Sequence, residues 1–357
     1  MARTKARKKP RRKANKKPRR LFWTRWSDER LLELRLCDLG LRVEGTWIAK
    51  RVKELYRELG ARGIRLRPHI WLTDEWFSPA GIPGIGVPFY LAHPRLMRLE
   101  RAKMLEVEGG TRADCLRILR HETGHALQHA YRPERRRSWQ RLFGLSSTKY
   151  PEYYRPNPAS KRYVQNLRFW YAQSHPDEDF AETFAVWLKP RSDWRKRYAS
   201  WPAIKKLEYV DLLMAEIGPT VPVVRTRAQM DSISTLRTTL GEFYAARRER
   251  YRMDIPNTYD RDLLRLFSND PRHRRHQAAS TFLRQHRAEI RARIAKWSGE
   301  YQATLDAVLA DMIARCRELR LRVVGSERQL VMDFTVMLTV NVMQVLYGRG
   351  RRDWIAL

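Results

Sequence analysis

The segment His121-Glu-Thr-Gly-His125 constrains this chain most, because it places two histidines four residues apart. On an α-helix, residues four apart are separated by about 40° around the axis, so both imidazoles project from one face. A second set of residues recurs on the opposite side with helical spacing and is apolar: Cys115, Leu116, Leu119, Ala126 and Leu127. The pattern predicts an amphipathic helix, starting at a capping box over residues 111–114, with the histidines facing a cleft.

Two imidazoles arranged in this way can bind one Zn²⁺ at ~2.0–2.1 Å. Glu122, next to the first histidine, can then accept a proton from a water that the metal activates. The pattern is typical of zinc-dependent peptidases. The alternative is a pair of surface histidines on an amphipathic helix.

A third protein ligand is needed to define the class of site. A metzincin would need glycine at position 128 and histidine at position 131, but the sequence has Gln128 and Tyr131. His129 falls on the same side as the two motif histidines, although a third consecutive turn cannot easily wrap one zinc ion. We interpret His129 as a cleft residue or a group that supports a ligand, with a surface histidine as the alternative.

The better candidate for the third ligand lies in the segment His175-Pro-Asp-Glu-Asp-Phe-Ala-Glu182, whose proline and acids suit the first turn of a helix. Glu178 and Glu182 are again four residues apart and share a face. We expect Glu178 to bind the metal and Glu182 to hydrogen-bond the other ring nitrogen of a ligand histidine. The alternative is a solvated acidic face that complements the helix dipole.

These residues resemble a known family. An HExxH motif followed at a distance by a helix with paired carboxylates is similar to the gluzincin arrangement. The runs RHETGHALQHAY and YAQSHPDEDFAETFAVWL resemble the bacterial putative zinc-binding metallopeptidase family, over roughly residues 30–215. The resemblance implies a gluzincin-like catalytic domain, with Glu178 as the third ligand and Glu182 behind it.

The resemblance also implies an oxyanion-stabilising tyrosine seven residues before the ligand glutamate, which is Tyr171 here. Tyr163 is the alternative candidate, and Tyr171 can instead be ordinary core packing. An active-site cleft bordered by an edge strand is implied as well. Residues 84–92 are the candidate strand, to which an extended peptide can add.

Along the chain we expect helices over 27–39, 47–59 and 176–189, and strands over 64–73 and 84–92. The predicted fold class is α+β and predominantly helical, with a small mixed sheet in the catalytic domain and an all-helical C-terminal region. The expected division is a disordered basic arm (1–20), a zinc metallopeptidase domain (21–222) and a helical domain or extension (223–357).

The chain is strongly basic, with 72 Lys and Arg against 39 Asp and Glu, a net charge of +33. The first 20 residues contain 12 of these bases and no acid, so residues 21–357 still carry +21. Such a potential favours nucleic acid or another polyanion as a partner, through residues 1–20 above all, although a solvated surface explains it equally.

Three isolated cysteines indicate a reducing compartment, and no apolar stretch follows the basic N-terminus as in a secretory signal, so a cytoplasmic location is expected. Residues 330–346 are apolar but contain Asp333, Asn341 and Gln344. They are therefore interpreted as a buried helix, and no transmembrane segment is expected.

The leading functional prediction is a zinc peptidase that acts on a peptide or protein. In one alternative, the chain is a nucleic-acid-associated zinc protein, or a protease acting on nucleic-acid-bound proteins, which uses the basic arm. In a second, it is a non-catalytic interaction protein whose C-terminal helices are the working part.

Overall fold

The structure is a computed structural model that describes residues 21–151, 154, 156–250 and 259–348. The predicted basic arm, residues 1–20, lies outside the described residues. The helices are α1 (Asp28–Leu32), α2 (Trp47–Ala61), α3 (Pro94–Met104), α4 (Arg112–Tyr131), α5 (Arg137–Phe143), α6 (Pro176–Leu188), α7 (Trp194–Arg197), α8 (Ile204–Ile217), α9 (Leu240–Arg250), α10 (Tyr259–Leu266), α11 (Ala279–Ser298), α12 (Gln302–Glu318) and α13 (Glu327–Gly348). The strands are β1 (His69–Thr73) and β2 (Gly84–Pro88). The predicted class, α+β and predominantly helical, is confirmed.

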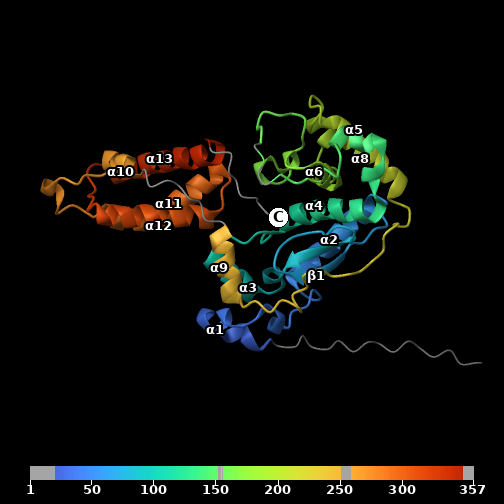
Figure 1. Ribbon diagram of the computed structural model, residues 1–357, viewed down its shortest axis with the longest axis horizontal. Coiled ribbons are helices and arrows are strands. Elements are labelled where there is room, and N and C mark those ends of the chain that lie inside the picture. Colours follow the sequence, from blue (N-terminus) through green and yellow to red (C-terminus); the bar gives the residue numbers. More distant parts are fainter. Residues whose placement is uncertain (1–20, 152–153, 155, 251–258, 349–357) are drawn as a thin grey trace, which may run out of the picture.

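Buried apolar side chains form two separate clusters, one drawn from residues 23–244 and one from residues 263–342. We call residues 21–250 the N-terminal unit and residues 259–348 the C-terminal bundle. In Figure 1, α10 to α13 lie along one another as an elongated bundle beside the N-terminal unit. The predicted division at residue 222 stays a prediction, and Ile233, Leu240 and Tyr244 pack into the first cluster.

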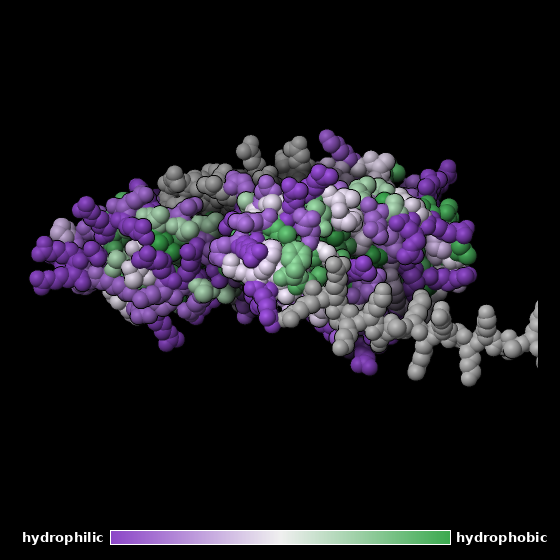
Figure 2. All heavy atoms as spheres, turned by 90° about the horizontal axis from the view of Figure 1, so that it is seen from below, coloured by the Kyte–Doolittle hydropathy of each residue, from purple (hydrophilic) through white to green (hydrophobic). Residues whose placement is uncertain are grey.

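The face of the molecule shown in Figure 2 is mostly polar on both units. On the face shown in Figure 2, hydrophilic side chains cover most of the molecule, and hydrophobic residues appear only as limited patches. The apolar content of the chain is therefore concentrated in the two clusters, as expected for side chains that leave water on folding.

The sheet consists of β1 and β2 in parallel, with His69 opposite Gly84 and Thr73 opposite Pro88. The second edge of β2 is already occupied. Gly86 exchanges both backbone hydrogen bonds with Phe77, at 2.8 and 3.4 Å, and the Ser78 hydroxyl donates to the Gly84 carbonyl. Contrary to the expectation for residues 84–92, β2 has no open edge to which a peptide could add in this structure, because loop 77–83 folds back along it.

Helices α4 and α6 pack closely at the centre of the N-terminal unit, with Gly124 against Ala181. A Cβ added at Gly124 would lie 2.7 Å from the Ala181 Cα and 3.2 Å from its carbonyl oxygen, so no larger side chain fits without a shift. Glycine costs about 1 kcal/mol relative to alanine inside a helix. Here it allows the close approach of the two helices that carry the metal-ligand candidates.

Some predicted elements are shorter than expected. The helix expected over 27–39 is instead α1 followed by a 3-10 turn, Leu36–Leu39. The Leu36 and Cys37 amides donate to the carbonyls of Thr238 and Leu236. Each backbone amide has a single N–H to donate. The hydrogen bonds to these distant carbonyls therefore replace those that a continuous helix would form. Likewise β2 ends at Pro88, where a 3-10 turn, Phe89–Ala92, begins.

The apolar segment 330–346 forms most of α13. Phe334, Leu338 and Val342 are fully buried in the C-terminal bundle, whereas Met332 and Val336 on the same helix are exposed. Within the part of the chain that the structure describes, no helix combines the length and the apolar composition needed to cross a membrane.

Candidate metal centre

The two motif histidines are carried by α4, which begins where the sequence predicts. The Thr111 side chain caps the helix by accepting from the Asp114 amide at 3.1 Å. The facing helix α6 begins in a similar way, with the His175 ring accepting from the Asp177 amide and Pro176 in the first turn. These two caps set the residues at which both helices begin.

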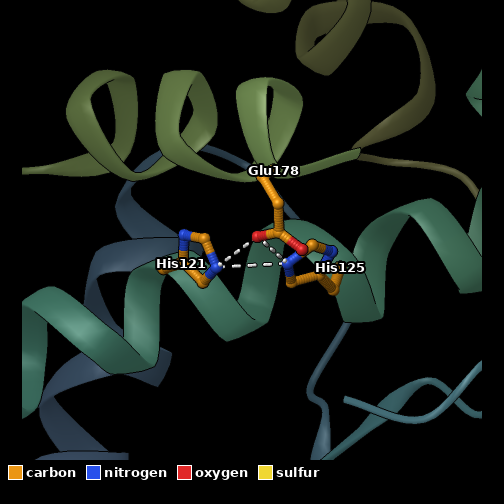
Figure 3. Close-up of side chains that lie close together, drawn as sticks. All are labelled: His121, His125 and Glu178. Atoms are coloured by element: carbon orange, nitrogen blue, oxygen red, sulfur yellow. Dashed lines mark hydrogen bonds and ion pairs between the residues drawn. The ribbon is translucent and has the colours of Figure 1, made fainter. Parts of the chain in front are cut away.

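His121, His125 and Glu178 converge between the two helices (Figure 3). The His121 Nε2, His125 Nε2 and Glu178 Oε2 atoms are 3.1 Å apart in each of the three pairs. Ligand atoms bound tetrahedrally at ~2.0–2.1 Å would be roughly 3.3 Å apart, so the three donors match a zinc ion in type and in spacing. His121 is fully buried, while the His125 side chain keeps 12% of its exposure, so the group opens to solvent on the His125 side.

Behind His121, a carboxylate fixes the ring. Glu182 Oε1 lies 2.9 Å from His121 Nδ1, which leaves Nε2 unprotonated for a metal when Nδ1 donates. Glu182 is itself held by the Asn166 side chain at 2.8 Å and by the Leu167 amide at 2.7 Å. The sequence analysis did not identify Asn166 or Leu167, because they lie in an irregular segment without periodicity.

Besides the two histidines, Glu178 has a partner that the sequence analysis did not identify. The Tyr150 hydroxyl donates to Glu178 Oε1 at 2.9 Å, and the Tyr150 ring stacks on His175 with centroids 3.7 Å apart. Tyr150 therefore orients the carboxylate oxygen that does not face the histidines. Only the aromatic, proline-rich composition of this segment could have drawn attention to it.

The ionisable groups of the site shift one another's pKa values strongly. Burial alone would lower the pKa of His121, but hydrogen bonds to Glu178 and Glu182 outweigh it and raise the pKa to about 10. Burial likewise opposes ionisation of Glu178, yet the two histidines hold its pKa well below the usual range. A carboxylate between two imidazoles thus binds positive charge strongly, as a cation site requires.

Glu122 differs from the other two glutamates of the site. It is 2% exposed, and its carboxylate has no hydrogen bond or ion pair with any residue in the described ranges. Burial raises its pKa, the charges of His121 and His125 oppose that rise, and the charge of Glu178 adds to it. An unengaged, basic carboxylate beside the ligand group is available to accept a proton.

The remaining candidates are placed as follows. The Tyr171 ring lies 5.8 Å from the His121 ring, and burial raises the pKa of its hydroxyl well above the usual value. Tyr163 instead packs under the Lys206 ammonium. His129 is outside the converging group. Burial lowers its pKa to about 4, and its ring interacts with the backbone of Ser78.

Residues 100–204 match the model of a protein family described as "putative zinc-binding metallo-peptidase". The matched region contains α4, α6 and the segment between them, so it includes the whole converging group. No curated protein and no solved structure matches the chain. The resemblance predicted from the motif is thereby confirmed over these residues. The zinc prediction is confirmed as well, since the family is zinc-binding and the structure contains a buried group that can hold the ion.

Proposed function

We propose that this chain, with the zinc-binding family signature in residues 100–204, is a peptidase that hydrolyses peptide bonds. In this proposal His121, His125 and Glu178 hold zinc, and Glu122 is the general base. The observation that carries it is the contrast between two buried carboxylates. Glu178 is held by His121, His125 and Tyr150, whereas the Glu122 carboxylate has no partner among the described residues. A purely structural metal site has no use for the second carboxylate.

Zinc, when bound, supplies a Lewis acid that lowers the pKa of a coordinated water to about 7 and polarises a carbonyl. Glu182 holds His121 in the tautomer whose Nε2 lone pair faces the metal position. Tyr150 holds Glu178 by its other oxygen. Both contacts reduce the reorganisation needed at the ligands and so favour binding.

Glu122 accepts the proton of the attacking water on its carboxylate and later delivers it to the leaving amine nitrogen. Its raised pKa suits this exchange, because a base works best when its pKa approaches the operating pH. No other residue is required to carry that proton.

Tyr171 donates a hydrogen bond to the negative charge that develops on the carbonyl oxygen. Its hydroxyl makes no hydrogen bond within the described part of the chain, whereas the Tyr150 hydroxyl is already engaged with Glu178. A raised pKa keeps the phenol protonated, as a donor must be. Tyr163, which packs against Lys206, is the weaker candidate.

Two measurements on purified protein test the proposal. Glu122→Gln should lose hydrolysis of an unfolded protein such as casein while it retains stoichiometric zinc by elemental analysis, because only the base is removed. His125→Ala and Glu178→Ala should lose zinc itself. Glu208→Gln, at an exposed position of α8, is the matched control and should change neither. Hydrolysis retained by Glu122→Gln would contradict the mechanism.

A further inference from the structure

A cavity adjoins the candidate metal centre on the side of the N-terminal half of α4. Its volume is about 70 Å³. Since one buried water needs roughly 10–15 Å³ by the same measure, the cavity has room for about five waters or one long side chain. Its walls include Asp114, Ile118, Phe169, Tyr171 and Tyr301.

This cavity lies next to the metal-ligand group. Ile118 precedes His121 by about one turn of α4, and Tyr171, whose ring is 5.8 Å from the His121 ring, forms part of the wall. A side chain in the cavity would therefore belong to a residue close to the bond being cleaved.

The charges around the cavity do not balance. Asp114 forms an ion pair with Arg117, and Glu106 lies 3.8 Å from Arg168. Glu108 also lines the cavity, but its carboxylate has no hydrogen bond or ion pair among the described residues. This wall therefore contains an acidic group without a salt-bridge partner among the described residues, in a chain with many more bases than acids.

A second buried acid lies just beyond this cavity. A narrow cavity of about 10 Å³ shares Glu106, Glu108 and Tyr301 with the first. Glu100 also lines it and is 1% exposed. Its Oε1 pairs with Arg247 at 2.7 Å, and the Tyr244 side chain is a further hydrogen-bond partner of its carboxylate. The negative charge of Glu100 adds to that of Glu106 and Asp114 in raising the pKa of Glu108.

The C-terminal bundle completes the wall. Tyr301 comes from the start of α12, and its ring lies 6.4 Å from that of Phe169. A Cβ at Gly299 would be 3.3 Å from the Phe169 ring, so the two units touch closely here. Phe169 and Trp170 both adopt left-handed backbone conformations, with φ of 61° and 53°. Such strain persists where surrounding contacts fix the chain.

We propose that this cavity is a specificity pocket for a positively charged side chain of the substrate, with Glu108 as the counter-ion and Tyr301 of the C-terminal bundle as a wall. The inference rests on the proposed peptidase function and adds a substrate class to it. The aromatic rings suit the aliphatic stem and planar head of an arginine, and the free carboxylate suits its charge.

The protonation behaviour of Glu108 agrees with this assignment. Burial raises its pKa to about 7, Arg247 opposes the rise, and Asp114, Glu106 and Glu100 add to it. Glu300 adds to the acidic surroundings through Glu106. A cation entering the cavity would relieve the mutual repulsion of these acids.

The test uses full-length zinc-loaded protein. Cleavage sites in a peptide library are first located by mass spectrometry. Two matched peptides are then compared, with arginine or uncharged citrulline at the preferred position. A charge-assisted hydrogen bond to Glu108 should favour arginine by about 10–100-fold in kcat/KM. Glu108→Gln should reduce this preference to about threefold or less, and Glu208→Gln should retain it. Thermal unfolding of Glu108→Gln checks that the variant folds.

Equal cleavage of the two peptides by the wild type, or an unchanged preference in Glu108→Gln, would overturn the pocket assignment. If the wild type cleaves no peptide at all, the peptidase proposal fails instead. In that case, fluorescently labelled peptides that carry either arginine or citrulline at one fixed position are bound to zinc-loaded Glu122→Gln, and fluorescence anisotropy tests the pocket separately. Preferential binding of arginine that is lost in the Glu108→Gln/Glu122→Gln double variant supports the pocket, and equal binding removes it.

Discussion

The two hydrophobic clusters differ in what else they bury. In the N-terminal unit, charged and ionisable groups are buried among the apolar side chains: Glu100, Arg120, His121, Glu122, Glu178, Asp179 and Glu182. Among the described side chains of the C-terminal bundle, Glu300 is the buried charged group, and it lies at the boundary with the N-terminal unit. The rest of that bundle is held by apolar contacts such as those of Phe334 and Leu338.

This difference separates an apolar bundle from a unit that contains a group able to hold a metal ion. Buried charges cost desolvation energy that their pairing only partly returns, so they are weak evidence for stability. In the N-terminal unit, His121 and Glu178 belong to the group that can hold a metal ion, and Glu182 hydrogen-bonds His121. Other buried charges are paired: Arg120 with Glu58 and Asp179 with Lys206. We therefore expect substitutions to act on zinc in one unit and on packing alone in the other.

The largest effect on stability is expected in the C-terminal bundle. Phe334→Ala should lower the free energy of unfolding by about 3–5 kcal/mol, because it leaves a cavity in an apolar core. Urea unfolding followed by circular dichroism measures this change. Met332→Ala, on the exposed face of the same helix, should change stability by only about 0.5 kcal/mol. Loss of bound zinc in Phe334→Ala would show that the two units are coupled.

A smaller but more informative effect is expected at the helix contact. Gly124→Ala should destabilise the protein by about 1–3 kcal/mol and weaken zinc binding, because the new methyl group forces α4 away from Ala181. Gly60→Ala in α2 is the matched control. Its Cβ would meet only the flexible end of Arg67, so stability should hold or rise. Equal behaviour of the two variants would contradict the role of Gly124.

The carboxylate behind His121 should affect the metal more than the fold. Glu182→Gln should weaken zinc binding by about 10–100-fold, because the negative charge that orients and strengthens His121 is lost. Competition with a fluorescent chelator measures the affinity. A zinc affinity within about twofold of the wild type would show that the charge of Glu182 does not strengthen His121 as a ligand.

The smallest effect is expected in the pH dependence of the stability of the metal-free protein. The folded pKa of His121, about 10, is above its ordinary value of 6.5. Its contribution to stability is therefore complete below pH 6.5 and is lost as the pH rises towards 10. Over the same range zinc should bind more tightly, by up to about tenfold per pH unit for each proton displaced. Calorimetry in buffers of different ionisation enthalpy counts those protons, and a count of zero would contradict the coupling.

Part of the candidate site could be predicted because its residues repeat with helical spacing. His121 and His125, and likewise Glu178 and Glu182, are four apart on elements whose capping residues are visible in the chain. Periodicity of this kind depends only on local geometry.

Other parts of the site had no such signal. Tyr150 reaches Glu178 from an irregular segment, and Tyr301 meets Phe169 across more than 130 residues of sequence. The occupied edge of β2 escaped prediction for the same reason, since loop 77–83 has no pattern that reveals how it folds back.

The sequence by itself indicated zinc as the metal, the capped helices that carry the candidate ligands and the predominantly helical class of the fold. Only the tertiary structure decided that Gly124 lets α4 and α6 approach, that Glu122 stays without a partner and that Glu108 faces a cavity closed by Tyr301. The physical reason is the distance along the sequence over which each interaction acts. Helix propensity, capping and ligand spacing act within one or two turns, whereas burial and the pairing of charges depend on which distant segments meet.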